Sequence, residues 1–183
     1  MDWRSLLDAR PVVVALAGSN GAGKSTFFRA HLADAGLRFI NADDLAVALD
    51  LGAYEAAAFA AELRAGLIKR RESFVFETVL SDPVGAKVAE LEEASRQGMH
   101  VVLSFIRIDS PATSRQRVAM RVSQGGHDVP DEKLETRLAR MLENLDRAIG
   151  SLPVVVVFDN IDLACPFRLE AVYRRGTDVL PVS

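Results

Sequence analysis

The chain contains only one cysteine, Cys165, among its 183 residues. A single cysteine cannot form an internal disulfide, and no Cys/His spacing suits a structural zinc ion. The formal net charge is only −3, so no overall positive field points to nucleic acid. These shortages exclude a scaffold built on disulfides or zinc, and they leave a nucleic-acid role without support.

Long hydrophobic runs are also absent. The first apolar run, Val12–Ala17, is far shorter than the roughly 20 residues of a transmembrane helix. Met1-Asp2-Trp3-Arg4 places an acidic residue at the start, and Pro11 precedes the first apolar run, which is unlike a signal peptide. We therefore expect a cytoplasmic protein without membrane contact.

Apolar residues make up 49% of the chain and charged residues 26%, which is the composition of a globular protein. Apolar runs of strand length alternate with segments of helical period, a pattern that predicts a mostly parallel sheet covered on both faces. We expect an α/β fold with five or six strands. It would form one domain over residues 1–183, with its core at about residues 11–176.

The expected strands are Val12–Ala17, Arg38–Ile40, Phe74–Thr78, His100–Ile108, Val154–Phe158 and, at an edge, Arg168–Tyr173. The expected helices are Lys24–Ala33, Asp43–Asp50, Tyr54–Arg71, Ser81–Gln97, Ser110–Val122 and Asp131–Ile149. The tail after Gly176 is expected to be loose.

A glycine-rich segment follows the first predicted strand and opens the first predicted helix. It reads Gly18-Ser19-Asn20-Gly21-Ala22-Gly23-Lys24-Ser25-Thr26, which matches the phosphate-binding loop motif G-x-x-x-x-G-K-[S/T]. Glycines let the backbone curl so that its N–H groups converge on a triphosphate, and the helix N-terminus adds its positive dipole end. The segment predicts ATP binding, with Lys24 on the β- and γ-phosphates and the Ser25 hydroxyl on Mg²⁺.

Acidic residues follow four of the predicted strands, at the edge where open parallel sheets bind ligands. Asp43 is the candidate general base for an acceptor hydroxyl; the alternative is an acid favoured by a helix N-terminus. Its neighbour Asp44 is interpreted as a cap. Glu77 and Thr78 are candidates for hydrogen bonds to the acceptor.

The polar residues after two further predicted strands each have two possible roles. Asp109 could serve Mg²⁺ indirectly or cap the next helix, and the cap is favoured. Asp159-Asn160 could border the nucleotide base or form a plain turn, and the turn is favoured.

Arginines lie on both sides of a Gly125-Gly126 loop, and they predict a lid at about residues 115–137. Such side chains can stabilise charge on the transferring phosphoryl group; the alternative is a solvated, salt-bridged helix face. His127 could contact a phosphate or bond within the loop. The arginines before the loop are Arg115, Arg117 and Arg121, and those after it are Arg137 and Arg140.

Together these segments resemble the zeta-toxin family of P-loop kinases, in particular its short stand-alone members. The similar segments are residues 18–26, Phe39-Ile40-Asn41-Ala42-Asp43-Asp44, Phe76-Glu77-Thr78-Val79-Leu80-Ser81, residues 117–130 ending in Gly-Gly-His-Asp-Val-Pro, Arg137 and Asn144-Leu145. The Walker segment is shared by many families, whereas the stretch at 117–130 is more specific.

This resemblance implies more than the residues do by themselves. It implies a Walker-type kinase core that phosphorylates a UDP-N-acetylated amino sugar, such as UDP-N-acetylglucosamine, at a sugar hydroxyl and so blocks peptidoglycan synthesis. By the same resemblance Asp43 is the base, and Lys24, Arg121 and Arg137 serve the phosphates. A small helical antitoxin is an expected partner.

Two other hypotheses remain open at this point. The chain could be a kinase of another metabolite or of an antibiotic, similar in design to gluconate or chloramphenicol kinases. It could also be a regulatory module that binds ATP without transferring phosphate.

Overall fold

The structure is a computed structural model, and it describes residues 2–108, 112–114, 116–117 and 134–179. Its centre is a seven-stranded sheet with the strand order β2-β3-β1-β4-β5-β6-β7. The strands are β1 (Val12–Ala17), β2 (Arg38–Ile40), β3 (Phe74–Thr78), β4 (His100–Arg107), β5 (Val154–Asp159), β6 (Arg168–Arg174) and β7 (Thr177–Asp178). The first five are parallel, and β6 and β7 are antiparallel to their neighbours.

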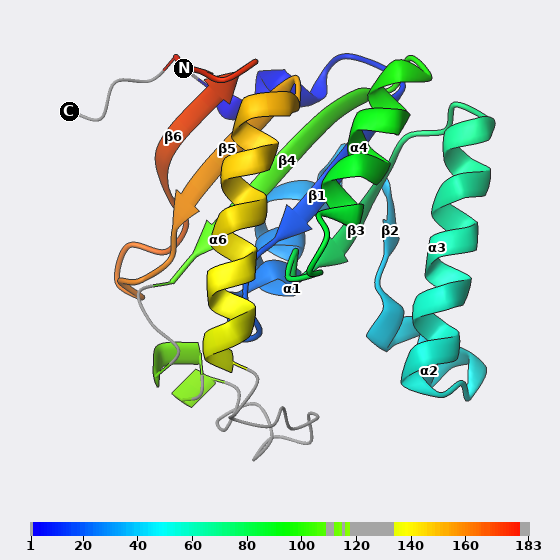
Figure 1. The fold of residues 1–183 in the computed structure, drawn as a ribbon, viewed down its shortest axis with the longest axis horizontal. Helices are drawn as coiled ribbons and strands as arrows, with labels where there is room; N and C mark the ends of the chain where they lie inside the picture. Colours follow the sequence, from blue (N-terminus) through cyan, green and yellow to red (C-terminus); the bar gives the residue numbers. More distant parts are fainter. Residues whose placement is uncertain (1, 109–111, 115, 118–133, 180–183) are drawn as a thin grey trace.

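Helices cover both faces of this sheet (Figure 1). They are the 3₁₀-helix Trp3–Leu7, α1 (Lys24–Phe27), α2 (Ala42–Leu49), α3 (Ala53–Lys69), α4 (Ala86–Arg96) and α6 (Leu134–Ser151). A π-helical turn, Phe28–Leu32, and a 3₁₀ turn, Ala33–Ala35, continue α1. Residues 112–114 and 116–117 are also helical, as expected for that segment.

The two faces of the sheet bury two separate apolar clusters. One cluster joins the strands to α3, α4 and α6, and the other joins them to α1 and the N-terminal 3₁₀-helix. Strand β1 is fully buried along its length, as expected for a central strand with both faces covered. The predicted α/β class with a mostly parallel, helix-flanked sheet is confirmed.

The structure corrects the sequence predictions at the margins of the sheet. It has seven strands rather than five or six, because the chain turns after β6 and adds β7. The residues of this turn, Arg175 and Gly176, both have positive φ, which suits a tight hairpin. Strand β6 is therefore not at the edge, and the chain directly after Gly176 is paired rather than loose.

The core also begins earlier than residue 11. Trp3 is 8% exposed, and its ring lies 5.5 Å from the ring of Phe27 and 5.0 Å from that of Phe158. An aromatic ring buried in this way contributes substantial apolar area to the core. The N-terminal segment thus packs against the helix that follows the phosphate-binding loop.

Helix α4 begins later than the sequence predicts. Ser81-Asp82-Pro83 resembles a helix start, but the helix begins at Ala86 and Gly85 before it has φ 74°, outside the right-handed helical region. The Asp82 carboxylate still caps the helix, because it accepts hydrogen bonds from the main-chain N–H groups of Ala86 and Lys87. Asp82 therefore serves the start of α4 from four residues upstream, across a turn that the sequence did not indicate.

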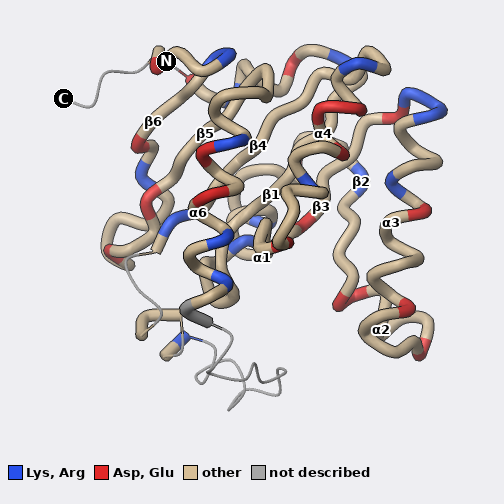
Figure 2. The backbone as a smooth tube through the Cα atoms, viewed as in Figure 1, with Lys and Arg blue, Asp and Glu red and all other residues tan. Residues whose placement is uncertain are grey.

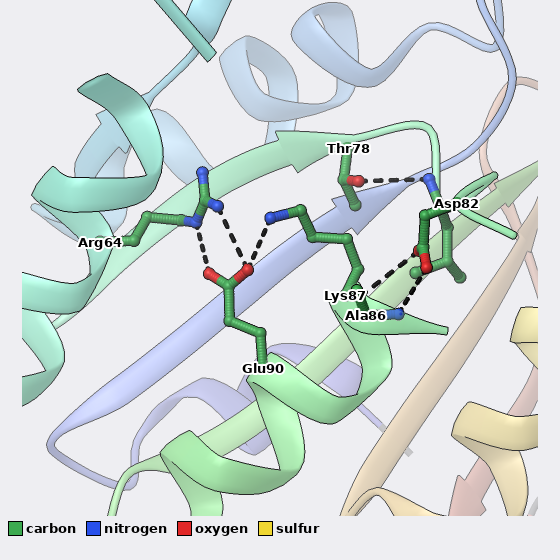
Figure 3. A network of polar contacts seen from close by, with 7 residues as sticks. Arg64, Thr78, Asp82, Ala86, Lys87 and Glu90 are labelled. Carbon is green, nitrogen blue, oxygen red and sulfur yellow. Dashed lines mark hydrogen bonds and ion pairs between the residues drawn. The ribbon is translucent and has the colours of Figure 1, made fainter. Parts of the chain in front are cut away.

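A buried ion pair joins α3 to α4 beside the end of β3 (Figure 3). Arg64 is 5% exposed, and its Nε and Nη2 donate to the two carboxylate oxygens of Glu90 at 2.7 and 3.2 Å. Lys87 donates to Glu90 from within α4, and the Arg64 guanidinium lies 4.7 Å from the ring centre of Phe76. This contact fixes α3 against the strand that ends in Glu77 and Thr78.

Candidate active site

The loop after β1 has the backbone that phosphate binding requires. A Cβ atom at Gly18 would lie 2.6 Å from the Ile106 carbonyl oxygen, and one at Gly23 would lie 2.9 Å from Asn160 Nδ2. Both glycines also have positive φ, of 148° and 94°. Only glycine fits these positions, so the loop can curl closely around a ligand and lead directly into α1.

Lys24 is the first residue of α1 and is buried. Its Nζ donates to the carbonyl oxygens of Gly18 and Ser19 at 3.1 and 3.0 Å. The ammonium group therefore lies against the loop that the motif assigns to phosphates. The helix N-terminus adds a positive dipole end at the same place.

Two buried side chains donate hydrogen bonds to main-chain carbonyls of this loop, and the sequence analysis predicted neither contact. Asn160, just after β5, is 3% exposed, and its Nδ2 donates to the Ala22 carbonyl at 2.8 Å. Ser114 is also buried, and its Oγ donates to the Asn20 carbonyl at 2.7 Å. The favoured interpretation of Asp159-Asn160 as a plain turn therefore leaves out the hydrogen bond that Asn160 makes to the phosphate-binding loop.

Asp159 itself has a structural role. Its carboxylate accepts the Ile161 N–H at 2.9 Å and an Arg168 N–H at 2.8 Å. Burial alone would raise the pKa of Asp159, but these hydrogen bonds and the nearby Arg107 outweigh burial and lower it. Asp159 thus forms the turn and an ion pair at the end of β5, as the turn interpretation predicts.

Asp43 lies in the first turn of α2 and is exposed. Its main-chain N–H donates to the side-chain oxygen of Asn41 at 2.8 Å, so Asn41 caps this helix. The interpretation of Asp44 as the cap is therefore wrong. Figure 2 shows acidic positions gathered at α2, which carries Asp43 and Asp44 and is followed by its C-cap residue Asp50.

Glu77 lies at the end of β3, paired in register with Leu16 of β1. Burial raises the pKa of Glu77, and the charge of Lys24 and a hydrogen bond with Ser25 oppose this rise. Its Oε1 is buried and has no hydrogen-bond partner within the described residues. Thr78 Oγ1 accepts the Leu80 N–H at 3.2 Å, which leaves its own proton available for a ligand.

A cleft of about 530 Å³ brings most of these residues together. The phosphate-binding loop and α1 form one wall, and the ends of β2 and β3 with α2 and α3 form the other. Its lining residues are Asn20, Gly21, Gly23, Lys24, Ser25, Thr26, Arg29, Asn41, Ala42, Asp43, Ala57, Glu77, Thr78, Val79 and Arg117. The cleft thus unites the predicted phosphate site with the predicted acceptor residues, and it adds Arg29, which the sequence analysis did not single out.

The predicted lid is only partly described. Arg117 lines the cleft, and its Nη2 donates to the carbonyl oxygens of Asn160 and Ile161 at 2.9 and 3.2 Å. Arg137 lies near the start of α6, half-buried, and is not a lining residue of this cleft. Arg121, together with Arg115, His127, both lid glycines and Asp109, lies outside the described residues.

The oxygen atoms that line the cleft suit a Mg²⁺ ion that is held mainly by nucleotide phosphates. Magnesium prefers oxygen ligands and is usually bound by few protein groups together with substrate phosphates. The Ser25 hydroxyl is such an oxygen donor, and the Glu77 carboxylate that hydrogen-bonds with Ser25 is a second one. In the described part of the chain no three His, Cys, Asp or Glu side chains are grouped to hold a metal without a nucleotide.

None of the described helices has the length and apolar character needed to cross a membrane.

A phosphate-binding loop after β1, with β3 between β1 and β2 in a parallel sheet, places the chain in the P-loop kinase class of α/β proteins. Within this class the chain belongs to the zeta toxin family, whose model matches residues 4–170. The resemblance seen in the sequence is thereby confirmed. Family membership and fold together support ATP binding and ATP-dependent phosphoryl transfer.

One sequence relative and several solved structures are similar to the chain at low sequence identity. A Haemophilus influenzae protein described only as uncharacterized is 29% identical over 125 residues, which are 66% of this chain and 87% of that protein. A chain of the AvrRxo1-ORF1:ORF2 complex crystallised with ATP superposes with a TM-score of 0.73 at 19% identity, over 97% of this chain and 63% of that one. The present chain therefore spans less than two thirds of that larger neighbour.

Two further solved structures are similar in fold. One comes from the PezAT toxin–antitoxin system of Streptococcus pneumoniae, with a TM-score of 0.60 and 17% identity over 86% of this chain and 74% of that chain. The other is a gluconokinase from Sinorhizobium meliloti, with a TM-score of 0.54 and 22% identity over 86% of this chain and 85% of that chain.

Proposed function

We propose that this protein is a kinase that transfers the γ-phosphoryl group of ATP to a hydroxyl group of a small molecule. The observation that carries the proposal is the shared cleft: Lys24 and Ser25 line it together with Asp43 and Glu77. The same cleft is thus lined by a phosphate-binding loop and by carboxylates, which are the groups that phosphoryl transfer to an alcohol requires. A module that only binds ATP would not need these carboxylates.

In the proposed reaction the acceptor oxygen attacks the γ-phosphorus, and the bond from that phosphorus to the β–γ bridging oxygen breaks. The hydroxyl proton passes to the Asp43 carboxylate, and ADP leaves. The loop amides and Lys24 hold the phosphates in line for this attack. Bound Mg²⁺, placed on the Ser25 hydroxyl, would neutralise charge on the β- and γ-oxygens.

The other predicted residues have supporting roles in this proposal. Glu77 and Thr78 orient the acceptor by hydrogen bonds. Arg121 and Arg137 stabilise the charge on the transferring group, and Arg117 fastens the start of the lid segment beside the nucleotide, through its bonds to residues 160 and 161.

The leading acceptor is a UDP-N-acetylated amino sugar such as UDP-N-acetylglucosamine, as the family resemblance implies. The gluconokinase neighbour favours a second candidate, a small polyhydroxy metabolite, because its similar fold covers most of both chains. The PezAT neighbour belongs to a toxin–antitoxin system, which supports a small helical antitoxin as the proposed partner.

The acceptor can be identified by mass spectrometry. The purified protein is incubated with Mg-ATP and a panel of UDP-sugars, free sugars and sugar acids, and the products are searched for the mass of one added phosphate. The proposal expects one such product, with UDP-N-acetylglucosamine first. A product from a sugar acid alone would favour the second candidate, and no product from any acceptor would contradict the kinase proposal.

A further inference from the structure

Arg29 lines the cleft but has no role in the reaction described above. It lies five residues after Lys24, in the π-helical turn Phe28–Leu32. At about 1.5 Å per residue, its backbone is roughly 7 Å further from the phosphate-binding helix terminus than that of Lys24. Single π turns inside helices are frequent at functional sites.

An aromatic contact sets where this turn lies. The ring of Phe28 stacks on that of Phe39 with centroids 3.9 Å apart and an interplanar angle of 10°. Phe39 belongs to β2 and precedes the cleft residues Asn41 and Asp43 by two and four positions. The stack therefore fastens the segment that carries Arg29 to the acceptor side of the cleft.

The charges of the cleft suggest what Arg29 does. Among the described residues, three cationic side chains line it: Lys24, Arg29 and Arg117. Lys24 donates to the carbonyls of residues 18 and 19, and Arg117 donates to those of residues 160 and 161. The Arg29 side chain is exposed, and within the described part of the chain no hydrogen bond or ion pair is recorded for it.

The acceptor wall is otherwise acidic, since Asp43 and Glu77 both line it. These carboxylates would repel an acceptor that carries a negative charge. The Arg29 guanidinium, which lines the same cleft from the segment that continues α1, offsets this repulsion, and its planar fork suits phosphate and carboxylate oxygens. The position thus favours a charged acceptor over a neutral one.

We infer that Arg29 forms a subsite for an anionic group of the acceptor, a phosphate, diphosphate or carboxylate. The inference rests on the proposed kinase function and narrows its substrate class. A UDP-sugar and a sugar acid both satisfy it, whereas a neutral sugar or a neutral antibiotic does not. ATP also carries phosphates, so the test must separate the nucleotide from the acceptor.

Chemical labelling of Arg29 gives a direct test. The protein is treated with phenylglyoxal, which modifies accessible arginines, and the labelled peptides are quantified by mass spectrometry. Five samples are compared: no ligand, the ATP analogue AMP-PNP with Mg²⁺, and this complex with UDP-N-acetylglucosamine, N-acetylglucosamine or gluconate. Arg38, exposed on β2 and paired with Glu72, serves as the internal control.

We expect the UDP-sugar to protect Arg29 in the nucleotide-saturated protein, whereas the neutral sugar leaves it reactive. Gluconate, a carboxylate, is the second anionic probe. Full protection by AMP-PNP alone would assign Arg29 to ATP and overturn the inference. Equal protection by the neutral sugar, or no protection by either anionic probe, would overturn it as well.

Binding measurements on variants complete the test. Arg29→Gln should raise the Kd of the anionic ligand that protects Arg29 by at least about tenfold, because one hydrogen bond between charged groups is lost. Arg29→Lys should recover part of this affinity, and the Kd for AMP-PNP should stay within about twofold in both variants. A higher Kd for AMP-PNP together with an unchanged Kd for the anionic acceptor would contradict the inference.

Failure of the kinase proposal would look different. If the wild-type protein phosphorylates no acceptor but an anionic ligand still protects Arg29, the anionic subsite stands and the kinase proposal falls. If phosphate transfer to an anionic acceptor occurs equally well in Arg29→Gln and wild-type protein, the kinase proposal stands and the subsite falls.

Discussion

Asn160 is a single buried amide that joins three segments of the site. Its Nδ2 holds the Ala22 carbonyl, its main-chain N–H bonds to Arg107, and its own carbonyl accepts from Arg117. The phosphate-binding loop, β4 and the start of the lid segment thus share one residue. Replacing the Asn160 side chain would remove its hydrogen bond to the loop and leave unchanged the groups that are proposed to bind ATP.

We predict that Asn160→Ala weakens ATP binding by about tenfold, because one buried hydrogen bond to the loop is lost. Isothermal titration with AMP-PNP and urea unfolding would be measured together. The matched control is Asn144→Ala: Asn144 is also buried, but its Nδ2 donates to the Leu80 and Asp82 carbonyls. The control should lose stability and keep its affinity for ATP; equal loss of affinity in both would mean that Asn160 acts only through general stability.

Lys24 is the residue whose loss should affect the chemistry most. Lys24→Ala removes the ammonium that lies against the loop, so the γ-phosphate loses its main side-chain partner. We predict a fall in ATP turnover of at least about 10³-fold, as for other groups that stabilise developing charge. The control is Lys69→Ala, at the exposed end of α3. Turnover that survives Lys24→Ala would refute the assignment of the phosphate site.

At the scale of elements, the acceptor wall depends on how α3 is held. Helix α2 has no buried residue, and the buried residues of α3 are Ala56, Ala60, Arg64 and Leu67, so only a small part of these two helices is held by fully buried apolar side chains. The Arg64–Glu90 pair adds a specific contact between α3 and α4 (Figure 3). It therefore positions the helix whose Ala57 lines the cleft.

We predict that Glu90→Gln destabilises the protein by about 3 kcal/mol at pH 7, because it leaves the buried Arg64 charge without its partner. Urea unfolding would measure this against Glu93→Gln, whose exposed pair with Arg96 on the same helix should contribute about 0.5 kcal/mol or less. Equal losses in the two variants would show that burial of the Arg64 pair is unimportant.

The same variant should change the dependence of stability on pH. Burial tends to raise the pKa of Glu90, but the hydrogen bonds from Arg64 and Lys87 outweigh it and lower the pKa. Its contribution is therefore present above the ordinary glutamate pKa of about 4.3 and is lost as the pH falls through the lower folded value. The stability gap between wild type and Glu90→Gln should narrow below about pH 4; a constant gap would contradict the pKa shift.

The elements were largely predictable from the sequence, because they depend on local patterns. Apolar runs gave the parallel strands, and the glycine-lysine motif located the loop and α1. Helix α4 begins at Ala86, later than predicted, because a turn through Gly85 precedes its first residue. Strand β7 has only two residues, too few for any periodic signal.

At the scale of the whole molecule, the site is formed by residues that are distant in sequence. Parallel strands end at one edge of the sheet, so the loop after β1 meets Asp43 after β2 and Glu77 in β3. That convergence was predictable from the motif and the expectation of a parallel sheet, whose strands bind ligands at their carboxyl ends. Ser114 and Arg29 were missed, and for Asn160 the less favoured position near the nucleotide was the better one. A lone asparagine, serine or arginine gives no local signal for a contact that only the folded chain creates.

The central claim is that one cleft holds ATP on one wall and deprotonates an acceptor hydroxyl on the other. The most direct test is Asp43→Asn, which removes the base and keeps the side-chain size, with Asp44→Asn in the same turn as the control. Phosphate transfer to the acceptor and the Kd for AMP-PNP are measured for both. We predict that Asp43→Asn loses at least about 10²-fold in transfer and binds the nucleotide as wild type does, while Asp44→Asn retains both; unchanged transfer in Asp43→Asn would contradict the account.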